Sequence, residues 1–163
     1  MGTVFWIGEQ AMSGIFTLSI VCVGGRYLKE PYQFLIKAPV ELTLDDLASH
    51  ILRMVDFKRD DHLDQFYLAN SVRGQKTWFM QDGEWDDDAH VMDMQLSAIF
   101  PLPKHKKLFY LYDFGASWRF QITKRGKETQ SQPEIEYPCI VSETGSKPKE
   151  FGDEVNWDGD DED

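Results

Sequence analysis

The segment that most constrains the fold spans residues 107–122 and reads KLFYLYDFGASWRFQI. Its first half is a run of aromatic and aliphatic side chains, and aromatic residues favour the pleated surface of a β-strand. Its second half, WRFQI, alternates apolar with polar residues, as a strand with one buried face does. Between the halves, Asp113 and Gly115 supply turn chemistry, because aspartate bonds its own turn backbone and glycine accepts positive φ. The segment predicts a central β-hairpin with Gly115 at positive φ.

Further strands are predicted on both sides of this hairpin in the sequence. Alternation of apolar and polar residues predicts strands at residues 15–23 and 32–37, which are separated by the turn signal Gly24-Gly25. A third strand is predicted at residues 62–68, and a short fourth strand at residues 77–80. After Arg125 the composition becomes polar and rich in proline, so no strand is predicted there.

One helix has a clear start signal. Thr43 has the side chain of an N-cap, and Asp46 stands three residues later as its acidic partner. The apolar residues that follow recur at helical spacing and predict a long helix that lies across a sheet face. They are Leu44, Leu47, Ala48, Ile51, Leu52 and Val55. A shorter helical stretch is predicted at residues 94–100, where Pro101 ends it.

The order of these elements predicts an α+β fold. We expect a single domain over residues 1–152, with one mixed β-sheet packed by one long helix plus a short helix, similar to ubiquitin-like β-grasp topology. Seven of the eleven residues in 153–163 are acidic, so we expect a disordered acidic tail.

Three phrases of the chain resemble a known family. YDFGASWRFQI resembles the signature Y-D-F-G-D-x-W-x-H-x-I of the plasmid pRiA Orf-three-like family. Upstream, LTLDDLASHILRMVDFKRDDHLDQF resembles the helix and strand of that family, and YPCIVSETGSKPKEFGD resembles its ending. The resemblance spans residues 15–153. Members occur on plasmids and with insertion sequences, so it implies a mobile-element context, while the activity of the family is unassigned.

The resemblance also implies positions for a metal or acid–base site. The family pattern offers one histidine in the helix, one aspartate after Asp-Phe-Gly, and a second histidine beyond the tryptophan. In this chain those positions hold Ala48, Ala116 and Phe120. His50 is two positions further along the helix, which turns it about 200° away and predicts that it faces solvent. We therefore expect no site at these positions, and we expect that the protein has no catalytic residue, binds no cofactor and binds no stoichiometric transition metal.

Charge and hydropathy exclude several classes of partner. The net charge is -11, with 17 basic and 28 acidic residues, which argues against nucleic acid and anionic membranes as partners. No apolar run approaches the roughly 20 residues of a membrane span. Cys22 and Cys139 are the only cysteines, so we expect two reduced thiols and a cytoplasmic protein.

The candidate binding residues are His62, Tyr112, Asp113 and Trp118. The leading hypothesis is a non-catalytic protein-interaction module that binds another protein. One alternative is a mobile-element-associated nucleic-acid accessory protein, and another is a hydrolase-like enzyme with an unrecognised site. A basic face would favour nucleic acid, and the residues that could gather into one are Lys104, Lys106, Lys107, Arg119, Lys124, Arg125 and Lys127.

Overall fold

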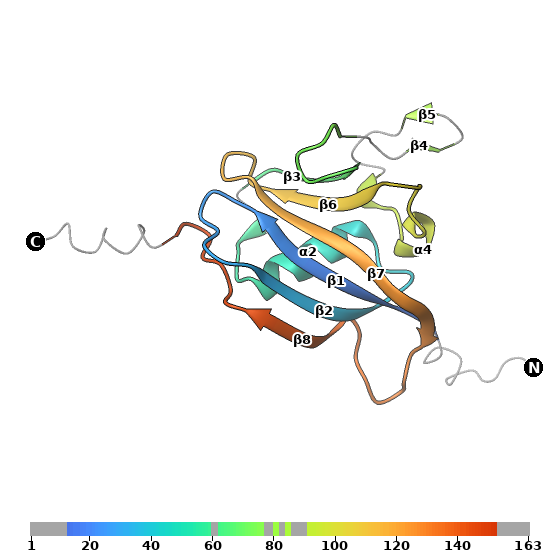
Figure 1. The fold of residues 1–163 in the computed structure, drawn as a ribbon. Helices are drawn as coiled ribbons and strands as arrows, with labels where there is room; N and C mark the ends of the chain where they lie inside the picture. Colours follow the sequence, from blue (N-terminus) through green and yellow to red (C-terminus); the bar gives the residue numbers. More distant parts are fainter. Residues whose placement is uncertain (1–12, 60–61, 77–79, 82–83, 86–90, 153–163) are drawn as a thin grey trace, which may run out of the picture.

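The computed structural model describes residues 13–59, 62–76, 80–81, 84–85 and 91–152 (Figure 1). The elements, in chain order, are β1 (Gly14–Gly24), β2 (Tyr32–Pro39), α2 (Leu44–Met54), β3 (Asp64–Ala69), β4 (Met80–Gln81), β5 (Glu84–Trp85), α4 (Leu96–Ile99), β6 (Lys107–Tyr112), β7 (Trp118–Gln130) and β8 (Cys139–Gly145). The α+β class is therefore confirmed. Most of the predicted strand at 77–80 and the predicted acidic tail lie outside the described residues.

One six-stranded sheet forms the centre of the structure, in the order β3-β6-β7-β1-β2-β8 (Figure 1). Every pair of neighbours in it is antiparallel. A mixed sheet requires a parallel pair as well, so the predicted β-grasp topology is not confirmed. The sequence pattern could not reveal this. Alternation shows which face of a strand is buried, but it does not show which other strand pairs with it or in which direction.

Two hairpins supply the middle four strands. The predicted central hairpin is confirmed, since β6 pairs with β7 from Leu108↔Ile122 to Tyr112↔Trp118. β1 and β2 form the second hairpin, in which Cys22 and Tyr32 are the residue pair nearest the turn. The hairpins meet where β1 pairs with β7, with Ile20 opposite Ile122. The interior position of β6 agrees with its apolar residues on both faces.

Helix α2 begins as its sequence predicts and ends earlier. The Thr43 hydroxyl accepts a hydrogen bond from the Asp46 N–H at 3.1 Å, so the N-cap is confirmed. The helix has 11 residues, and the long helix is not confirmed. It ends because Asp56 takes a left-handed conformation with φ 63°, and the N–H of Phe57 bonds the carbonyl of Leu52 at 2.9 Å. This is a Schellman ending in which aspartate occupies the position usually held by glycine.

The main core lies on the face of the sheet that α2 covers (Figure 1). Alternate residues of the strands meet the apolar stripe of the helix there, and α4 closes one side. A smaller cluster lies apart from this core and consists of Tyr67, Ala69, Phe109 and Leu111, with Val23 and Val72 packed against it. The loop after β3 contributes Val72 to that cluster, so it covers part of the other face.

Sequence reasoning missed β5, the part of β7 beyond Arg125 and, most importantly, strand β8. It pairs with β2, with Ile140 opposite Ile36, and it forms one edge of the six-stranded sheet. Ile140 and Val141 are exposed there. The polar composition of this segment hid it, because an edge strand with little burial need not alternate between apolar and polar residues.

The two cysteines are free, as expected. Cys139 belongs to β8, and Cys22 is buried in β1. Burial raises the pKa of the Cys22 thiol to about 12, so this side chain stays protonated and behaves as an apolar core residue.

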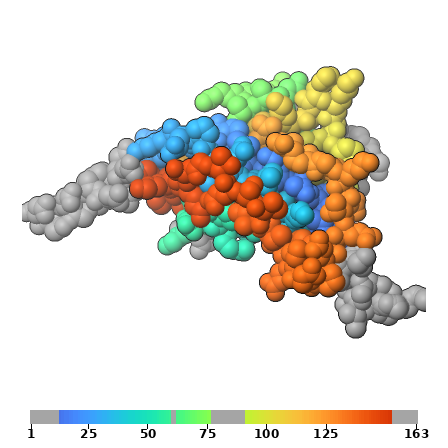
Figure 2. Space-filling model, turned by 60° about the horizontal axis from the view of Figure 1, so that its bottom comes forward, coloured from blue at the N-terminus to red at the C-terminus, as the bar shows by residue number. Residues whose placement is uncertain are grey.

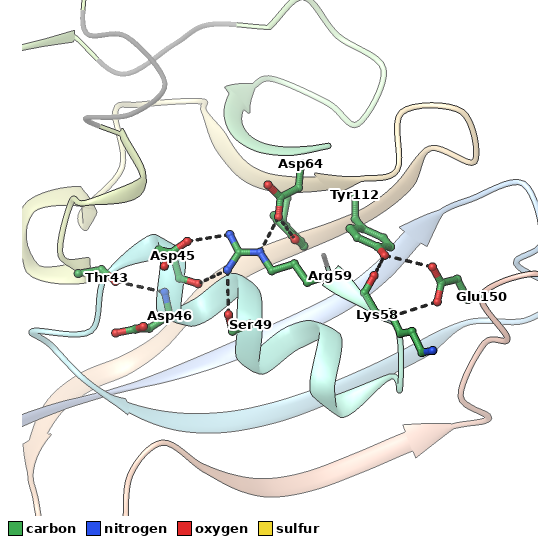
Figure 3. Close-up of polar contacts among 10 residues, drawn as sticks. Thr43, Asp45, Asp46, Ser49, Lys58, Arg59, Asp64, Tyr112 and Glu150 are labelled. Carbon is green, nitrogen blue, oxygen red and sulfur yellow. Dashed lines mark hydrogen bonds and ion pairs between the residues drawn. The ribbon is translucent and has the colours of Figure 1, made fainter. Parts of the chain in front are cut away.

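Arg59 fixes the segment between α2 and β3 (Figure 3). Its guanidinium donates to the carboxylate of Asp64 at 2.9 Å, to that of Asp45 at 2.8 Å and to the hydroxyl of Ser49 at 2.8 Å. These contacts join the start of α2 to the start of β3. They therefore hold the intervening residues, which include one side of the site described below.

Among the described helices, none combines the length and apolar character that crossing a membrane requires.

Candidate functional site

Three segments converge at one end of the sheet, which we call the turn end. They are the β1–β2 turn, the β6–β7 turn and the C-terminal segment 146–152 (Figure 1). The N–H of Arg26 bonds the carbonyl of Ala116 at 2.8 Å, which joins the first two. Tyr27 and Lys29 line a small cavity together with residues 146–149, which joins the third segment to the first, and Figure 2 shows these two segments side by side. The turn end carries most of the predicted site residues.

Asp113 organises the β6–β7 turn, as the sequence predicts. One carboxylate oxygen, Oδ1, accepts hydrogen bonds from the N–H groups of Gly115 at 3.2 Å and Ala116 at 3.3 Å. The prediction that Gly115 holds positive φ is wrong. The left-handed residues are Asp113 and Ser117, with φ of 62° and 56°. Aspartate tolerates this conformation because its side chain bonds the local backbone.

His62 lies between two carboxylates. Its Nδ1 is 3.6 Å from Oδ2 of Asp113, and its Nε2 is 3.8 Å from Oε2 of Glu150. The imidazole meets the ring of Tyr112 edge-on, with 5.5 Å between ring centroids, and Phe151 lies at 6.5 Å. We call His62, Asp113 and Glu150 the His62 cluster. The structure therefore brings together three of the predicted site residues: His62, Tyr112 and Asp113.

Glu150 is the member of this cluster that sequence reasoning missed. Its side chain is only 8% exposed. The N–H of Lys58 donates to Oε1 at 3.2 Å, and the hydroxyl of Tyr112 donates to Oε2 at 3.1 Å (Figure 3). The Tyr112 hydroxyl also contacts the carbonyl of Lys58. Glu150 lies in the phrase YPCIVSETGSKPKEFGD, but nothing in that phrase identifies it as a site residue, and only the folding of segment 146–152 onto the turn end reveals its position.

Trp118, the fourth predicted binding residue, belongs to the core. Its side chain is fully buried and packs against Phe57, with 4.9 Å between ring centroids. The structure therefore supports the core position that the alternation of WRFQI predicts for Trp118, and not its role as a candidate binding residue. The sequence could not distinguish the two roles, because tryptophan is common both in cores and at interfaces.

The three positions at which the family pattern offers a site are also buried. Ala48 lies in α2, Phe120 lies in β7, and Ala116 lies in the turn between β6 and β7. All three side chains belong to the main core cluster. None of these three side chains can be titrated, so the chain has no acid, base or metal ligand at these positions.

His50 is not directed into solvent as predicted. Both ring nitrogens are buried, and neither has a hydrogen-bond partner among the described residues. Burial lowers the pKa of His50, and the nearby charge of Arg53 lowers it further. The helical-wheel argument failed because other parts of the fold cover this side of α2.

The lowered pKa of His50 predicts a pH-dependent stability. A histidine whose folded-state pKa is depressed stabilises the fold above its ordinary pKa of 6.5, and this contribution declines as pH falls below that value. We expect His50→Gln to reduce the loss of melting temperature between about pH 7.5 and pH 5.5. The exposed His105 supplies the control, and His105→Gln should keep the slope of the parent protein. Equal slopes for His50→Gln and the parent in calorimetry would contradict the prediction.

A second feature of the turn end is a cationic cavity, which we call the Arg119 pocket. Its volume is about 460 Å³. Arg26, Arg73 and Arg119 line it, together with Val23, Val72 and the backbone of both turns. The three arginines come from three separate loops or strands, so their spacing in the sequence gives no sign of the pocket.

Arg119 is held in this pocket by neutral oxygens. Its Nη1 donates to the hydroxyl of Tyr67 at 2.8 Å and to the carbonyl of Val72 at 3.2 Å. Within the described part of the chain, no carboxylate forms an ion pair with Arg119, Arg26 or Arg73. Lys76 approaches the same Tyr67 ring at 5.0 Å. Burial lowers the pKa of Lys76, and the charge of Arg119 lowers it further. Positive charge is therefore concentrated here without a matching carboxylate among the residues that the structure describes.

The predicted basic face is divided between two places. Arg119 belongs to the Arg119 pocket, whereas Lys106, Lys107 and Lys124 line another cavity of about 410 Å³ beside Phe100. The second cavity lies where β6 begins, at the opposite end of that strand from the β6–β7 turn. No single described cavity collects all the basic residues of this region.

Comparison with known proteins agrees with the fold. The family model described as "Plasmid pRiA4b ORF-3-like protein" matches residues 33–155. The chain belongs to this family. No curated protein matches the chain.

A solved structure, a protein of unknown function from Methanosarcina mazei Go1, is similar with a TM-score of 0.58 and 24% identity. The match covers 80% of this chain and 68% of that chain. At this identity the likeness supports the fold alone.

Proposed function

We propose that this protein is a non-catalytic interaction module that binds an anionic group of a partner protein in the Arg119 pocket. The observation that carries the proposal is the Arg119 guanidinium, which is fixed by two neutral oxygens and has no carboxylate partner in the described part of the chain. A guanidinium held in this way keeps further N–H donors for a ligand. Its planar fork matches a carboxylate or a phosphate in a bidentate contact.

The charges around Arg119 support the same conclusion. Arg26 and Arg73 line the same cavity, and Lys76 is close enough for its pKa to be lowered by Arg119. Like charges that gather without counter-charges cost free energy in the empty pocket. An anionic ligand removes this repulsion as it binds, so part of its affinity comes from the arrangement already present in the protein.

The rest of the chain favours a compact anionic ligand over nucleic acid. A duplex presents a continuous row of phosphates, and affinity for it grows with the number of phosphates that are neutralised. This chain has a net charge of -11, so phosphates beyond the pocket would meet an acidic protein. One or two carboxylates of a protein segment need only the pocket. The mobile-element nucleic-acid alternative requires a longer basic surface than this pocket provides.

The binding of an acidic peptide to the protein tests this proposal. We expect a fluorescein-labelled glutamate-rich peptide to bind the full chain in an anisotropy titration at low salt. Arg119→Gln should weaken binding about 10–100-fold, because a hydrogen bond to a charged group contributes about 1.5–3 kcal/mol. The matched control is Arg125→Gln, since Arg125 is an exposed arginine of the same strand that does not line the pocket.

The same titration with a labelled DNA duplex separates the two partner classes. We expect binding of the duplex to be weaker than a dissociation constant of about 1 mM at about 0.15 M salt. Tighter duplex binding that Arg119→Gln abolishes would support the nucleic-acid alternative instead. Equal peptide affinity of the parent and Arg119→Gln proteins would overturn the proposed role of the pocket.

A further inference from the structure

We propose that the His62 cluster binds a divalent transition-metal cation such as Zn²⁺ or Co²⁺, with His62 and Glu150 as ligands and Asp113 as the positioning residue. This inference is independent of the Arg119 pocket and uses other side chains. It departs from the expectation that the protein binds no metal, an expectation that did not consider His62, Asp113 and Glu150 together.

The two carboxylates are already oriented by the fold. In Asp113, Oδ1 is occupied by the turn N–H groups, and Oδ2 faces Nδ1 of His62. In Glu150, Oε1 accepts from the N–H of Lys58, and Oε2 faces Nε2 of His62. Each carboxylate is therefore fixed by hydrogen bonds and directs one oxygen at the same imidazole, and in Glu150 that oxygen, Oε2, also accepts from the Tyr112 hydroxyl. Such fixed orientation is what a binding site requires of its side chains.

The charge of the cluster favours a cation. Asp113 and Glu150 are both half-buried or more, and in the described part of the chain neither forms an ion pair with a lysine or arginine. Partly buried carboxylates without a counter-charge are costly. A metal ion between them would supply the missing positive charge.

The spacing of the atoms also fits an ion. The separation of 3.8 Å between Nε2 of His62 and Oε2 of Glu150 exceeds hydrogen-bond length, and the 3.6 Å between Nδ1 and Oδ2 of Asp113 shortens to a hydrogen bond with a small side-chain rotation. Two ligands of one ion, each about 2.1 Å from it, stand about 3.4 Å apart in tetrahedral geometry. One ligand atom from each of the three residues lies within 4.8 Å of the others. Small side-chain rotations are therefore enough to close the site.

The two ring nitrogens of His62 have different tasks in this arrangement. They point in different directions, so one ion can bind only one of them. We assign Nε2 to the ion, because Glu150 lies on that side, and Nδ1–H to Asp113 as its acceptor. A carboxylate that accepts the other N–H of a metal-bound histidine fixes the ring and increases its basicity. Imidazole with carboxylate suits Zn²⁺ and related ions better than Mg²⁺.

The test is a titration of the full chain with CoCl₂, followed by visible absorption, and then displacement by ZnCl₂. We expect one ion per chain, bound with moderate affinity because only two protein side chains hold it, and no displacement by an excess of MgCl₂. His62→Ala should abolish the signal and Glu150→Gln should weaken binding at least tenfold. Asp113→Asn should weaken it about 10–100-fold, as loss of an orienting carboxylate does. Asparagine keeps an oxygen that can accept the turn N–H groups, so this variant tests positioning and not folding.

Two controls identify other sources of a signal. His105 is an exposed histidine and Cys139 is a partly exposed thiol, and both are outside the cluster. His105→Ala and Cys139→Ser should leave the titration unchanged. Circular dichroism of each variant establishes that it is folded. The proposal is overturned if folded His62→Ala binds Co²⁺ as the parent does, if a control variant abolishes the signal, or if the parent binds no Co²⁺ at about 1 mM.

Discussion

Trp118→Ala is expected to lower the free energy of unfolding by about 3–5 kcal/mol, the range of large buried aromatic residues replaced by alanine. The side chain is fully buried, and it fills the space between the ring of Phe57 and the backbone of Gly25. Its position opposite Tyr112 at the first pair of the central hairpin prevents the surroundings from collapsing into the cavity. Urea unfolding followed by circular dichroism measures the loss.

Trp118→Phe is the matched control for this prediction. The indole Nε1 of Trp118 is buried without a hydrogen-bond partner among the described residues, so phenylalanine removes volume and breaks no recorded hydrogen bond. We expect phenylalanine to retain most of the stability that alanine loses. A loss below about 1 kcal/mol for Trp118→Ala would place this side chain at the surface, where substitutions usually have small effects.

Gly25→Ala is expected to cost about 3 kcal/mol, from overpacking and backbone strain together. A Cβ atom at this position would lie 2.3 Å from Cε3 of Trp118, and φ is 154°. The indole is enclosed by the core and cannot move aside. Gly126 provides the comparison, because its φ is also positive, at 69°, and no atom lies within 4 Å of an added Cβ.

Gly126→Ala should therefore cost only the conformational term of about 1–2 kcal/mol. The difference between the two glycine variants measures the contact with Trp118. A double-mutant cycle provides a second measurement, because Gly25→Ala should be less costly in a Trp118→Ala background. Equal effects of Gly25→Ala in both backgrounds would show that the two residues are not in contact.

The parts of the fold that the sequence predicts are those encoded over a few residues. The central hairpin is visible in the alternation around Asp113, and the start of α2 is visible in Thr43 and Asp46. The antiparallel strand order and β8 were missed, because they depend on which distant segments meet. Gly115 shows a second kind of error, since the residues at positive φ are its neighbours Asp113 and Ser117. The hydrogen bonds of the Asp113 carboxylate offset the conformational cost that glycine would avoid.

The candidate sites also combine residues that short sequence phrases reveal with residues that only the fold brings together. His62 and Asp113 were found through short phrases in the sequence, whereas Glu150 is brought to them only when segment 146–152 packs against the turn end. The Arg119 pocket had no local signal at all. Arg26, Arg73 and Arg119 are far apart in the sequence, and each of them alone resembles an ordinary surface arginine.

The pairing of β1 with β7 has a consequence for the route by which the chain folds. The two hairpins and α2 are local and can form early, but the centre of the sheet joins Gly14 to Gln130. Closing so long a loop costs chain entropy before any contact across it stabilises the product, and non-local pairing of this kind slows folding. During synthesis, β1 therefore lacks its second neighbour, β7, until the chain has been made as far as residues 118–130. Until then one long side of β1 presents unpaired N–H and C=O groups, which can pair with another chain.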